Sequence, residues 1–317
     1  MNSAIDEIKK KFYYKYNLLT ILGPTAGGKT GFAAYVAKQF DGEIISADSR
    51  QVYRGMDIGT GKDIADYTVD GVEIPFHLID IKDAGEKYNL FEYQGDFFSA
   101  FEDIKKRNKI PVMCGGTGLY IEAIIGNFRL VEVPENRRLR EELEQKSIDE
   151  LIEILASMKK LHNVSEIDNK KRAIRNIEIE MYLKEHPEKR PNYPEIKSLN
   201  IGVKFDRKSQ KARITKRLYQ RIEEGMIDEV EILLNKGVSA DTLIYYGLEY
   251  KFVTLYLQGK LSKQEMIDKL EIAIHQFSKR QMTFFRHLEK KGHKIYWLDG
   301  YMTAEDKFQR VIDIIQK

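Results

Sequence analysis

The sequence has a single cysteine, Cys114, among 317 residues. One cysteine excludes an intramolecular disulfide framework and a cysteine-rich zinc site, and it is typical of a reducing compartment. The six histidines are scattered without metal-ligand spacing, so we expect no structural metal. No apolar run approaches the roughly 18 to 20 residues of a membrane span. Residues 1–16 also lack the apolar segment of a secretory signal. We therefore expect a cytoplasmic protein with no membrane partner.

A dominant charge of one sign is also absent. The chain has 52 Lys and Arg against 49 Asp and Glu, a net charge of +3, so total charge does not indicate a nucleic-acid partner. Local charge clusters have to be considered instead. Hydrophobic residues make up 42% and charged residues 32%, which suits a globular protein with a core. The length allows one large α/β domain with an insertion, or two domains.

A glycine-rich motif near the N-terminus is the strongest functional signal. It fits G-x-x-x-x-G-K-[ST] with the residues Gly23, Pro24, Thr25, Ala26, Gly27, Gly28, Lys29 and Thr30. An apolar run at 17–22 precedes it and a helical pattern at 31–40 follows it, the arrangement of a nucleotide-binding or ATP-binding P-loop. Lys29 is expected to reach a phosphate oxygen, and the Thr30 hydroxyl to help hold Mg²⁺. The alternative is a glycine-rich turn that binds nothing.

Strand and helix patterns alternate through the first part of the chain. Buried or alternating apolar segments at 17–22, 43–47, 72–80 and 110–114 predict strands, and the segments 31–40 and 90–107 predict helices. This alternation predicts an α/β fold with a parallel doubly wound sheet, which would carry the P-loop at its core. Residues 1–16 are expected to be a short extension before the first strand.

The pattern then changes to a charged helical segment. Residues 134–190 contain 13 Lys and Arg and 13 Asp and Glu, with leucines and isoleucines on apolar faces. We predict a helical insertion over 134–197 between two parts of the core, 1–133 and 198–317. The second part is expected to contain a strand at 198–205, helices near 208–236, 246–258 and 262–290, a strand at 294–298 and a final helix at 303–317.

Two acidic residues follow predicted strands. Asp48 ends the strand at 43–47 and Asp80 ends the strand at 72–80, and the carboxyl edge of an open α/β sheet is where ligands bind. A carboxylate there can act as a general base or hold magnesium through water. An aspartate that caps the next turn is the alternative for Asp48. The patterns alone do not choose between the two acids.

Three further stretches could contact an anion or RNA. Thr117 lies in a second glycine-rich junction, which could bind a polar ligand or could serve close packing only. Arg213, Arg217 and Arg221 form one stripe of a helix, in a segment, 204–221, with eight basic residues and one acid. The segment Lys279-Arg280-Gln281 precedes aromatic residues on a predicted helix, which suits RNA contact or a core stripe with basic flanks.

Four motifs together resemble the tRNA dimethylallyltransferase (isopentenyltransferase) family. They are Gly23-Pro-Thr-Ala-Gly-Gly-Lys-Thr30, Ser46-Ala-Asp-Ser-Arg-Gln-Val-Tyr-Arg-Gly-Met-Asp-Ile-Gly-Thr60, Gly115-Gly-Thr-Gly-Leu-Tyr120 and Lys279-Arg-Gln-Met-Thr283. The resemblance implies transfer of a dimethylallyl group from dimethylallyl diphosphate to N6 of the adenosine on the 3′ side of the anticodon in tRNA, with release of diphosphate. It also implies that the helical insertion grips the anticodon stem, and we expect Mg²⁺ as cofactor and a monomer.

The resemblance implies roles for single residues. Asp48 matches the general base, Thr25 a residue near the reacting centre, and Arg217 the arginine that binds diphosphate, although Arg213 lies one turn away and is not excluded. The residues that match the base-receiving stretch or tRNA-contacting positions are Asp48, Ser49, Arg50, Gln51, Thr117, Arg137, Lys171, Arg172 and Arg175, and Lys279, Arg280 and Gln281 fall in the last family motif.

The sequence departs from the family pattern at two places near these motifs. The family often has Ala-Lys-Pro where this chain has Gly61-Lys-Asp63, and its usual Gly-Tyr-Lys-Glu appears here as Tyr246-Gly-Leu-Glu249. Other functions therefore stay open at this point. One is an adenylate isopentenyltransferase or a small-molecule P-loop kinase, which would need no tRNA grip. Another is a non-catalytic RNA-binding nucleotide switch.

Overall fold

The computed structural model describes residues 2–158, 169–189 and 191–317. The chain forms two compact units, one made of Met1–Phe128 and Glu195–Lys317 and the other of Arg129–Pro194. We call them the core unit and the helical unit. Within the described residues, no helix is both long and apolar enough to cross a membrane.

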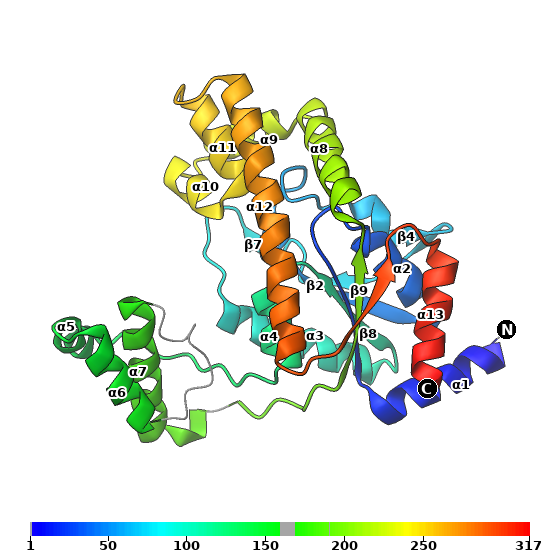
Figure 1. Ribbon diagram of the computed structural model, residues 1–317, viewed down its shortest axis with the longest axis horizontal. Helices are drawn as coiled ribbons and strands as arrows, with labels where there is room; N and C mark the ends of the chain where they lie inside the picture. The colour runs from blue at the N-terminus through cyan, green and yellow to red at the C-terminus, as the bar shows by residue number, and fades with distance from the viewer. Residues whose placement is uncertain (1, 159–168, 190) are drawn as a thin grey trace. The chain divides into compact units, whose positions relative to one another are not determined.

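The core unit is organised around a parallel sheet of six strands in the order β10-β9-β1-β8-β2-β6. The strands are β1 (Leu18–Leu22), β2 (Gly42–Ala47), β6 (Phe76–His77), β8 (Ile110–Gly115), β9 (Ser198–Lys204) and β10 (Ile295–Asp299). Figure 1 shows β9 next to β10, although they lie far apart in the sequence. This sheet confirms the predicted α/β fold with a P-loop-like core.

Helices cover both faces of the sheet, which explains why the strands are apolar throughout. All five residues of β1 are buried, as expected for a central parallel strand. Val112 of β8 packs in one core cluster with α1 (Asn2–Lys15), α2 (Lys29–Phe40) and α13 (Ala304–Gln316). The next residue, Met113, faces the other way, and its sulfur accepts a hydrogen bond from Tyr93 of α3 (Leu90–Lys106) at 3.7 Å.

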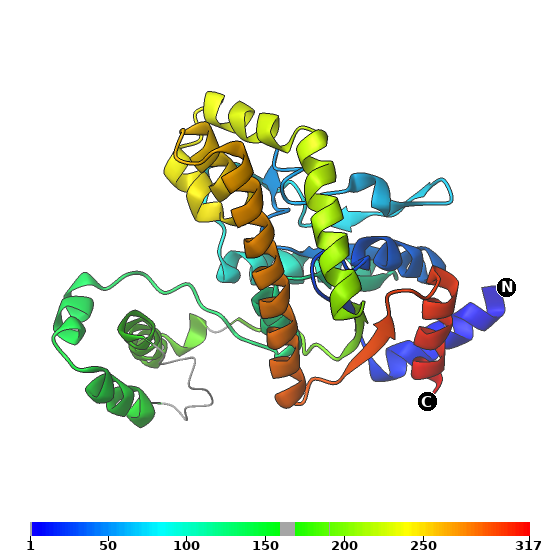
Figure 2. The same cartoon turned by 45° about the horizontal axis from the view of Figure 1, so that its top comes forward.

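A second apolar cluster joins a group of helices that extends the core unit beyond the sheet. The helices are α8 (Arg207–Glu223), α9 (Met226–Asn235), α10 (Ala240–Tyr246), α11 (Leu248–Leu257) and α12 (Lys263–Lys290). Val52, Tyr53 and Met56, from the loop after β2, are buried in the same cluster. Figure 2 shows α12 running from this helical group toward β10. The predicted helix at 208–236 is in fact two helices, separated at Gly225, and the one near 246–258 is preceded by α10.

One predicted strand is wrong over most of its length. Within 72–80 only Phe76–His77 pairs with β2, while β4 (Thr68–Val69) and β5 (Val72–Glu73) form a separate antiparallel pair. Leu78 and Asp80 have positive φ angles of 63° and 55°, so the backbone leaves the extended conformation there. Short elements complete this region: β3 (Tyr53–Arg54), η1 (Ile64–Tyr67) and β7 (Lys82–Asp83). Residues 2–15, expected as an extension, form α1.

The helical unit contains α5 (Arg137–Glu144), α6 (Ile148–Met158), α7 (Lys170–Glu185) and the 3₁₀ turn η3 (Pro187–Lys189). Its core includes Leu143, Leu151, Leu155 and Ile177. Glu178 is buried and its carboxylate pairs with Arg140 and Arg175, so a buried charge is compensated from two sides. The functional boundaries of the insertion, 134 and 197, stay a prediction.

The two chain connections of the helical unit leave the core unit side by side. The Asn127 side chain accepts from the Ile196 amide at 2.7 Å and donates to the Ile196 carbonyl at 3.1 Å.

Because the two connections lie side by side, we expect that replacing residues 129–194 by a short Gly-Ser linker leaves a core unit that unfolds cooperatively and still binds inorganic pyrophosphate. Calorimetric melting and titration with pyrophosphate test this expectation. Loss of the cooperative transition would show that the core unit depends on the helical unit.

Candidate functional site

The P-loop places a buried lysine at the start of a helix. Gly28 precedes α2 with φ 70°, a left-handed conformation that favours glycine, and the free amides of the first helical turn follow. The Lys29 ammonium donates to the Pro24 carbonyl at 2.7 Å. Burial lowers the pKa of Lys29 to about 8, since the charged form loses hydration. A phosphate group at this loop would raise the pKa of Lys29 back toward its ordinary value and accept hydrogen bonds from the helix amides.

A cavity of about 540 Å³ opens in front of the P-loop, within the range of small-molecule sites. Its wall includes many of the predicted site residues: Thr25, Ala26, Gly27, Gly28, Lys29, Thr30, Asp48, Ser49, Arg50, Gln51, Thr117, Arg213, Arg217 and Gln281. Gly23 and Pro24 are not part of the wall, although the Pro24 carbonyl holds Lys29. Residues from the P-loop, the loop after β2, the start of α4 (Gly118–Ile125) and helices α8 and α12 therefore meet at one cavity.

Asp48 follows β2 directly and belongs to this wall. Its Oδ1 accepts from the Arg50 amide at 2.9 Å, so the carboxylate also caps the turn, the alternative that the sequence had left open. Thr117 supports the same turn, because its Oγ1 accepts from the Ser49 amide at 3.0 Å. Asp80, the other candidate acid, is not on the wall and pairs with Lys62 at 2.5 Å. The structure thus places Asp48, and not Asp80, at the cavity.

One face of α8 holds the P-loop through polar side chains. Arg217 donates to the Thr25 hydroxyl, Gln210 donates to the Thr25 carbonyl, and Arg213 donates to the Ala26 carbonyl at 3.0 Å. The Arg213 guanidinium also lies over the Phe205 ring, 4.2 Å from its centroid. Burial, followed by the nearby Arg221 charge, lowers the pKa of Arg217 to about 10. Cationic groups thus crowd a buried site, and an anion in the cavity would relieve that cost.

Gln281 has a structural role that the sequence did not suggest. It is buried, and its amide accepts from the Thr25 amide at 2.8 Å and donates to the Gly116 carbonyl at 2.9 Å. It therefore ties the P-loop to the second glycine-rich junction. Its neighbours Lys279 and Arg280 are exposed on α12 and do not line the cavity.

The predicted tRNA residues of the helical unit have different surroundings. Arg175 pairs with Glu178 and donates to the Val133 carbonyl at 2.8 Å, so it serves the fold of the unit. Arg137 lies beside Met181 and Tyr182 at a hollow of about 480 Å³. Lys171 and Arg172 are exposed at the start of α7. Contacts of these residues with tRNA stay a prediction.

The loop at 57–62 forms a further part of the cavity wall, and a carboxylate of α9 holds it. Glu229 accepts from the amides of Asp57 and Ile58, both at 2.7 Å, and from Gly59 at 3.0 Å. The Tyr250 hydroxyl donates to the same carboxylate at 2.7 Å. Three backbone amides are thereby satisfied by one side chain, which fixes the loop.

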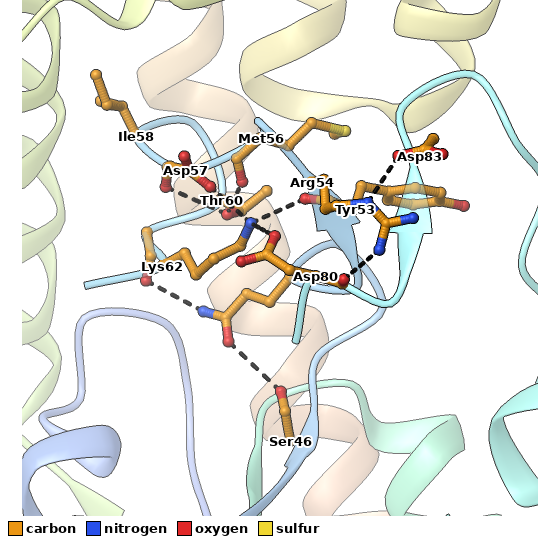
Figure 3. Close-up of polar contacts among 12 residues, drawn as sticks. Ser46, Tyr53, Arg54, Met56, Asp57, Ile58, Thr60, Lys62, Asp80 and Asp83 are labelled. Atoms are coloured by element: carbon orange, nitrogen blue, oxygen red, sulfur yellow. Dashed lines mark hydrogen bonds and ion pairs between the residues drawn. The ribbon is translucent and has the colours of Figure 1, made fainter. Parts of the chain in front are cut away.

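Lys62 holds the other end of this loop, as Figure 3 shows. Its ammonium donates to the Tyr53 carbonyl at 2.8 Å, to Asp57 at 2.6 Å and to Asp80 at 2.5 Å. Only 1% of the Lys62 side chain is exposed, so all three donors are used inside the protein. Next to it, the Gly61 carbonyl accepts from the Gln51 amide group at 3.1 Å, which orients a residue of the predicted base-receiving stretch.

Two further wall residues, Tyr246 and Glu249, were not predicted as site residues, whereas Arg221 is the third member of the predicted arginine stripe. Burial raises the pKa of the Glu249 carboxyl. The Arg50 guanidinium lies 5.5 Å from the centroid of the Tyr246 ring. The departure from the family motif at 246–249 was the sequence signal near Tyr246 and Glu249. For a metal, the described residues contain no group of three or more His, Cys, Asp or Glu side chains that could hold an ion.

Comparisons with known proteins give one consistent result. The family model described as IPP transferase matches residues 51–288. "tRNA dimethylallyltransferase 1" of Parabacteroides distasonis is 56% identical over 95% of this chain and 98% of that relative, and "tRNA dimethylallyltransferase 2" of Phocaeicola vulgatus is 54% identical over 95% and 98%. The crystal structure of a tRNA isopentenylpyrophosphate transferase from Bacillus halodurans aligns with a TM-score of 0.68 and 33% identity, covering 95% of this chain and 96% of that one.

Replacing Lys62 by methionine tests whether this lysine fixes the loop. Lys62→Met keeps most of the side-chain volume but leaves the Tyr53 carbonyl without this donor, so we expect a loss of about 1–3 kcal/mol in the free energy of unfolding. Urea unfolding measures the loss. Lys87→Met, at an exposed lysine, is the matched control and should change stability by less than about 0.5 kcal/mol. Equal stabilities of the two variants would contradict the anchoring role.

The pKa of Lys29 predicts a pH dependence of stability. Its pKa is about 8 in the folded protein against an ordinary value of 10.5, so between these values the unfolded state binds more protons. Burial of Lys29 therefore costs no stability above about pH 10.5, and the cost grows as the pH drops from about 10.5 to about 8, to roughly 3 kcal/mol in total. The difference in unfolding free energy between wild type and Lys29→Met should follow this curve, whereas the exposed-site variant Lys211→Met should give a flat difference.

Proposed function

The chain belongs to the IPP transferase family, and from this premise we propose that it is a tRNA dimethylallyltransferase. It transfers the dimethylallyl group from dimethylallyl diphosphate to N6 of the adenosine at tRNA position 37, on the 3′ side of the anticodon, and releases diphosphate. The observation that carries this function is the single cavity whose wall joins the P-loop, Asp48 and the loop after β2. One cavity can thus hold a diphosphate and a nucleobase together.

The P-loop side of the cavity binds the leaving group. The α2 amides, Lys29 and Arg217 present positive charge where the diphosphate gains negative charge as it departs. Because these groups are held in place before the substrate arrives, they need little reorganisation during the reaction. Thr25 contributes through its hydroxyl, which the Arg217 guanidinium already contacts. We assign the diphosphate clamp to Arg217, since Arg213 is occupied with the Ala26 carbonyl and the Phe205 ring.

Asp48 acts as the general base. The bond between the allylic carbon and the diphosphate oxygen breaks, and its electron pair leaves with the diphosphate. A new bond forms between that carbon and adenine N6, and Asp48 takes the proton that N6 loses. The turn that holds Asp48 is fixed by the Arg50 amide and by Thr117, so the carboxylate has a defined direction.

The target adenosine has to leave the anticodon loop to reach the cavity. Bases in single-stranded loops unstack at low cost, and Ser49, Arg50 and Gln51 form the part of the wall proposed to receive the base. Several groups of basic residues provide cations for tRNA phosphates. They are the basic face of α8, Lys279 and Arg280 of α12, and Arg137, Lys171 and Arg172 of the helical unit. We propose that the helical unit grips the anticodon stem.

Mg²⁺ fits the donor set at the P-loop. Thr30 lines the cavity, and its hydroxyl oxygen, together with diphosphate oxygens, is the kind of ligand that this ion prefers. A bound Mg²⁺ would neutralise charge on the leaving diphosphate. We also propose that the protein is a monomer and that it acts in the cytoplasm, where its single cysteine would stay reduced.

Incubation with labelled dimethylallyl diphosphate, unmodified tRNA, AMP and ATP tests the function directly. We expect label in the tRNA at the adenosine next to the anticodon. Label in AMP but not in tRNA would indicate an adenylate isopentenyltransferase, and nucleotide hydrolysis without prenyl transfer would indicate a nucleotide switch. Either result would overturn the proposed function.

Asp48→Asn tests the general base. Asparagine keeps the size and can still accept from the Arg50 amide, but it cannot take the N6 proton as a carboxylate does. We expect kcat to fall by roughly 10²- to 10⁴-fold while both substrates still bind. Asp70→Asn, at an exposed aspartate outside the cavity, is the control and should leave kcat unchanged. A near-wild-type kcat for Asp48→Asn would remove Asp48 from the mechanism, and a loss that extra Mg²⁺ restores would make it a metal ligand.

A further inference from the structure

The arginine stripe of α8 has a third member that the proposed function does not use. Arg213 and Arg217 contact the P-loop, and Arg221 follows one turn later on the same face and lines the same cavity. Only 6% of the Arg221 side chain is exposed. A surface arginine for tRNA phosphates would be far more open, so Arg221 needs another explanation.

Arg221 is poorly compensated inside the protein. Its Nη2 atom is buried and has no hydrogen-bond partner among the described residues. The nearest carboxylate, Glu249, lies 4.0 Å from Nη1, which is longer than a hydrogen bond. The N–H groups of a buried guanidinium normally all donate hydrogen bonds, because these bonds offset the free-energy cost of the lost hydration. A binding site for an anion would explain such a group.

The loop opposite Arg221 leaves room for it at a single position. Gly61 has φ 65°, and a β-carbon added there would overlap the Arg221 guanidinium. The loop cannot move away easily, since Glu229 holds the amides of 57–59 and Lys62 anchors the next residue. Because Gly61 has no side chain, it leaves the space that the Arg221 guanidinium occupies.

The geometry of α8 relates Arg221 to the diphosphate. Residues four apart on a helix lie about 6 Å apart along its axis, comparable to the extent of two linked phosphate groups. Arg217 and Arg221 thus present two guanidinium groups, one turn apart, to one cavity. Lys29 adds a third buried cation at the P-loop, and a polyanion matches this set better than a neutral group does.

We propose that Arg221 is a second arginine ligand of the allylic diphosphate, beside Arg217, and that Gly61 makes its position possible. The identity of the anion rests on the proposed function, whereas the anion site itself does not. Glu249 lies along the wall beside Arg221, and the diphosphate supplies the hydrogen-bond acceptors that Glu249 does not provide.

Titration of the full-length protein with inorganic pyrophosphate tests the proposal without any prenyl transfer. Arg221→Met keeps the length of the side chain and removes the charge, and we expect its affinity for pyrophosphate to fall about 10- to 100-fold, the range for hydrogen bonds to charged groups. Arg207→Met, an exposed arginine at the start of the same helix, should bind pyrophosphate like wild type. Wild-type affinity in Arg221→Met would overturn the proposal. A protein that binds pyrophosphate through Arg221 but does not prenylate tRNA would overturn only the proposed function.

Two further variants keep the proposal testable if Arg221→Met folds poorly. Arg221→Lys retains the charge and should bind pyrophosphate more tightly than Arg221→Met, and equal affinities would contradict a direct role. Gly61→Ala should lower pyrophosphate affinity by displacing Arg221. It should lower it no further when combined with Arg221→Met, because both changes remove the same contact. Additive losses would show that Gly61 and Arg221 act independently.

Discussion

Buried positive charge is the constraint on which the rest of this structure depends. Lys29, Arg217 and Arg221 all line one cavity, and burial lowers the pKa of Lys29 and of Arg217 because their charged forms lose hydration there. Folding therefore has to hold these groups together against their repulsion. The parallel sheet provides the P-loop, α8 provides the arginines, and the apolar cluster around α8 to α12 supplies the packing energy that keeps the two in contact.

Three polar side chains, Gln281, Glu229 and Lys62, hold the loops around the cavity in place. Gln281 links the P-loop to the Gly116 junction, Glu229 holds the loop at 57–59, and Lys62 holds its end. Each of these side chains makes its hydrogen bonds to backbone atoms or to other partners within the protein. Such side chains leave the backbone little freedom, which suits a reaction in which an allylic carbon and a nucleobase must meet in one orientation.

The sequence patterns predicted those parts of the molecule whose structure is determined by interactions between neighbouring residues. The P-loop, the strands beside it and Asp48 were predictable, because glycine spacing and apolar runs specify them over a few residues. The strand at 72–80 was not, since Pro75 and the left-handed conformations of Leu78 and Asp80 interrupt an apparently alternating segment. The far wall of the cavity was predictable only in part. Arg221 belongs to the predicted arginine stripe, but its place near Glu249 could not be predicted, because it depends on helices distant in sequence that pack against the loop at 57–62. For Gln281 the sequence indicated an RNA contact or a core position. In the structure the side chain is buried and links the P-loop to the Gly116 junction.

The overlap between a side chain at position 61 and Arg221 also limits how the two positions can vary. A β-carbon at position 61 would meet the guanidinium end of Arg221, so a side chain there would displace this end from its present place. The two positions are 160 residues apart in the chain (221 minus 61), yet in the folded protein they share one small volume. A change at either position therefore alters the space that is available to the other.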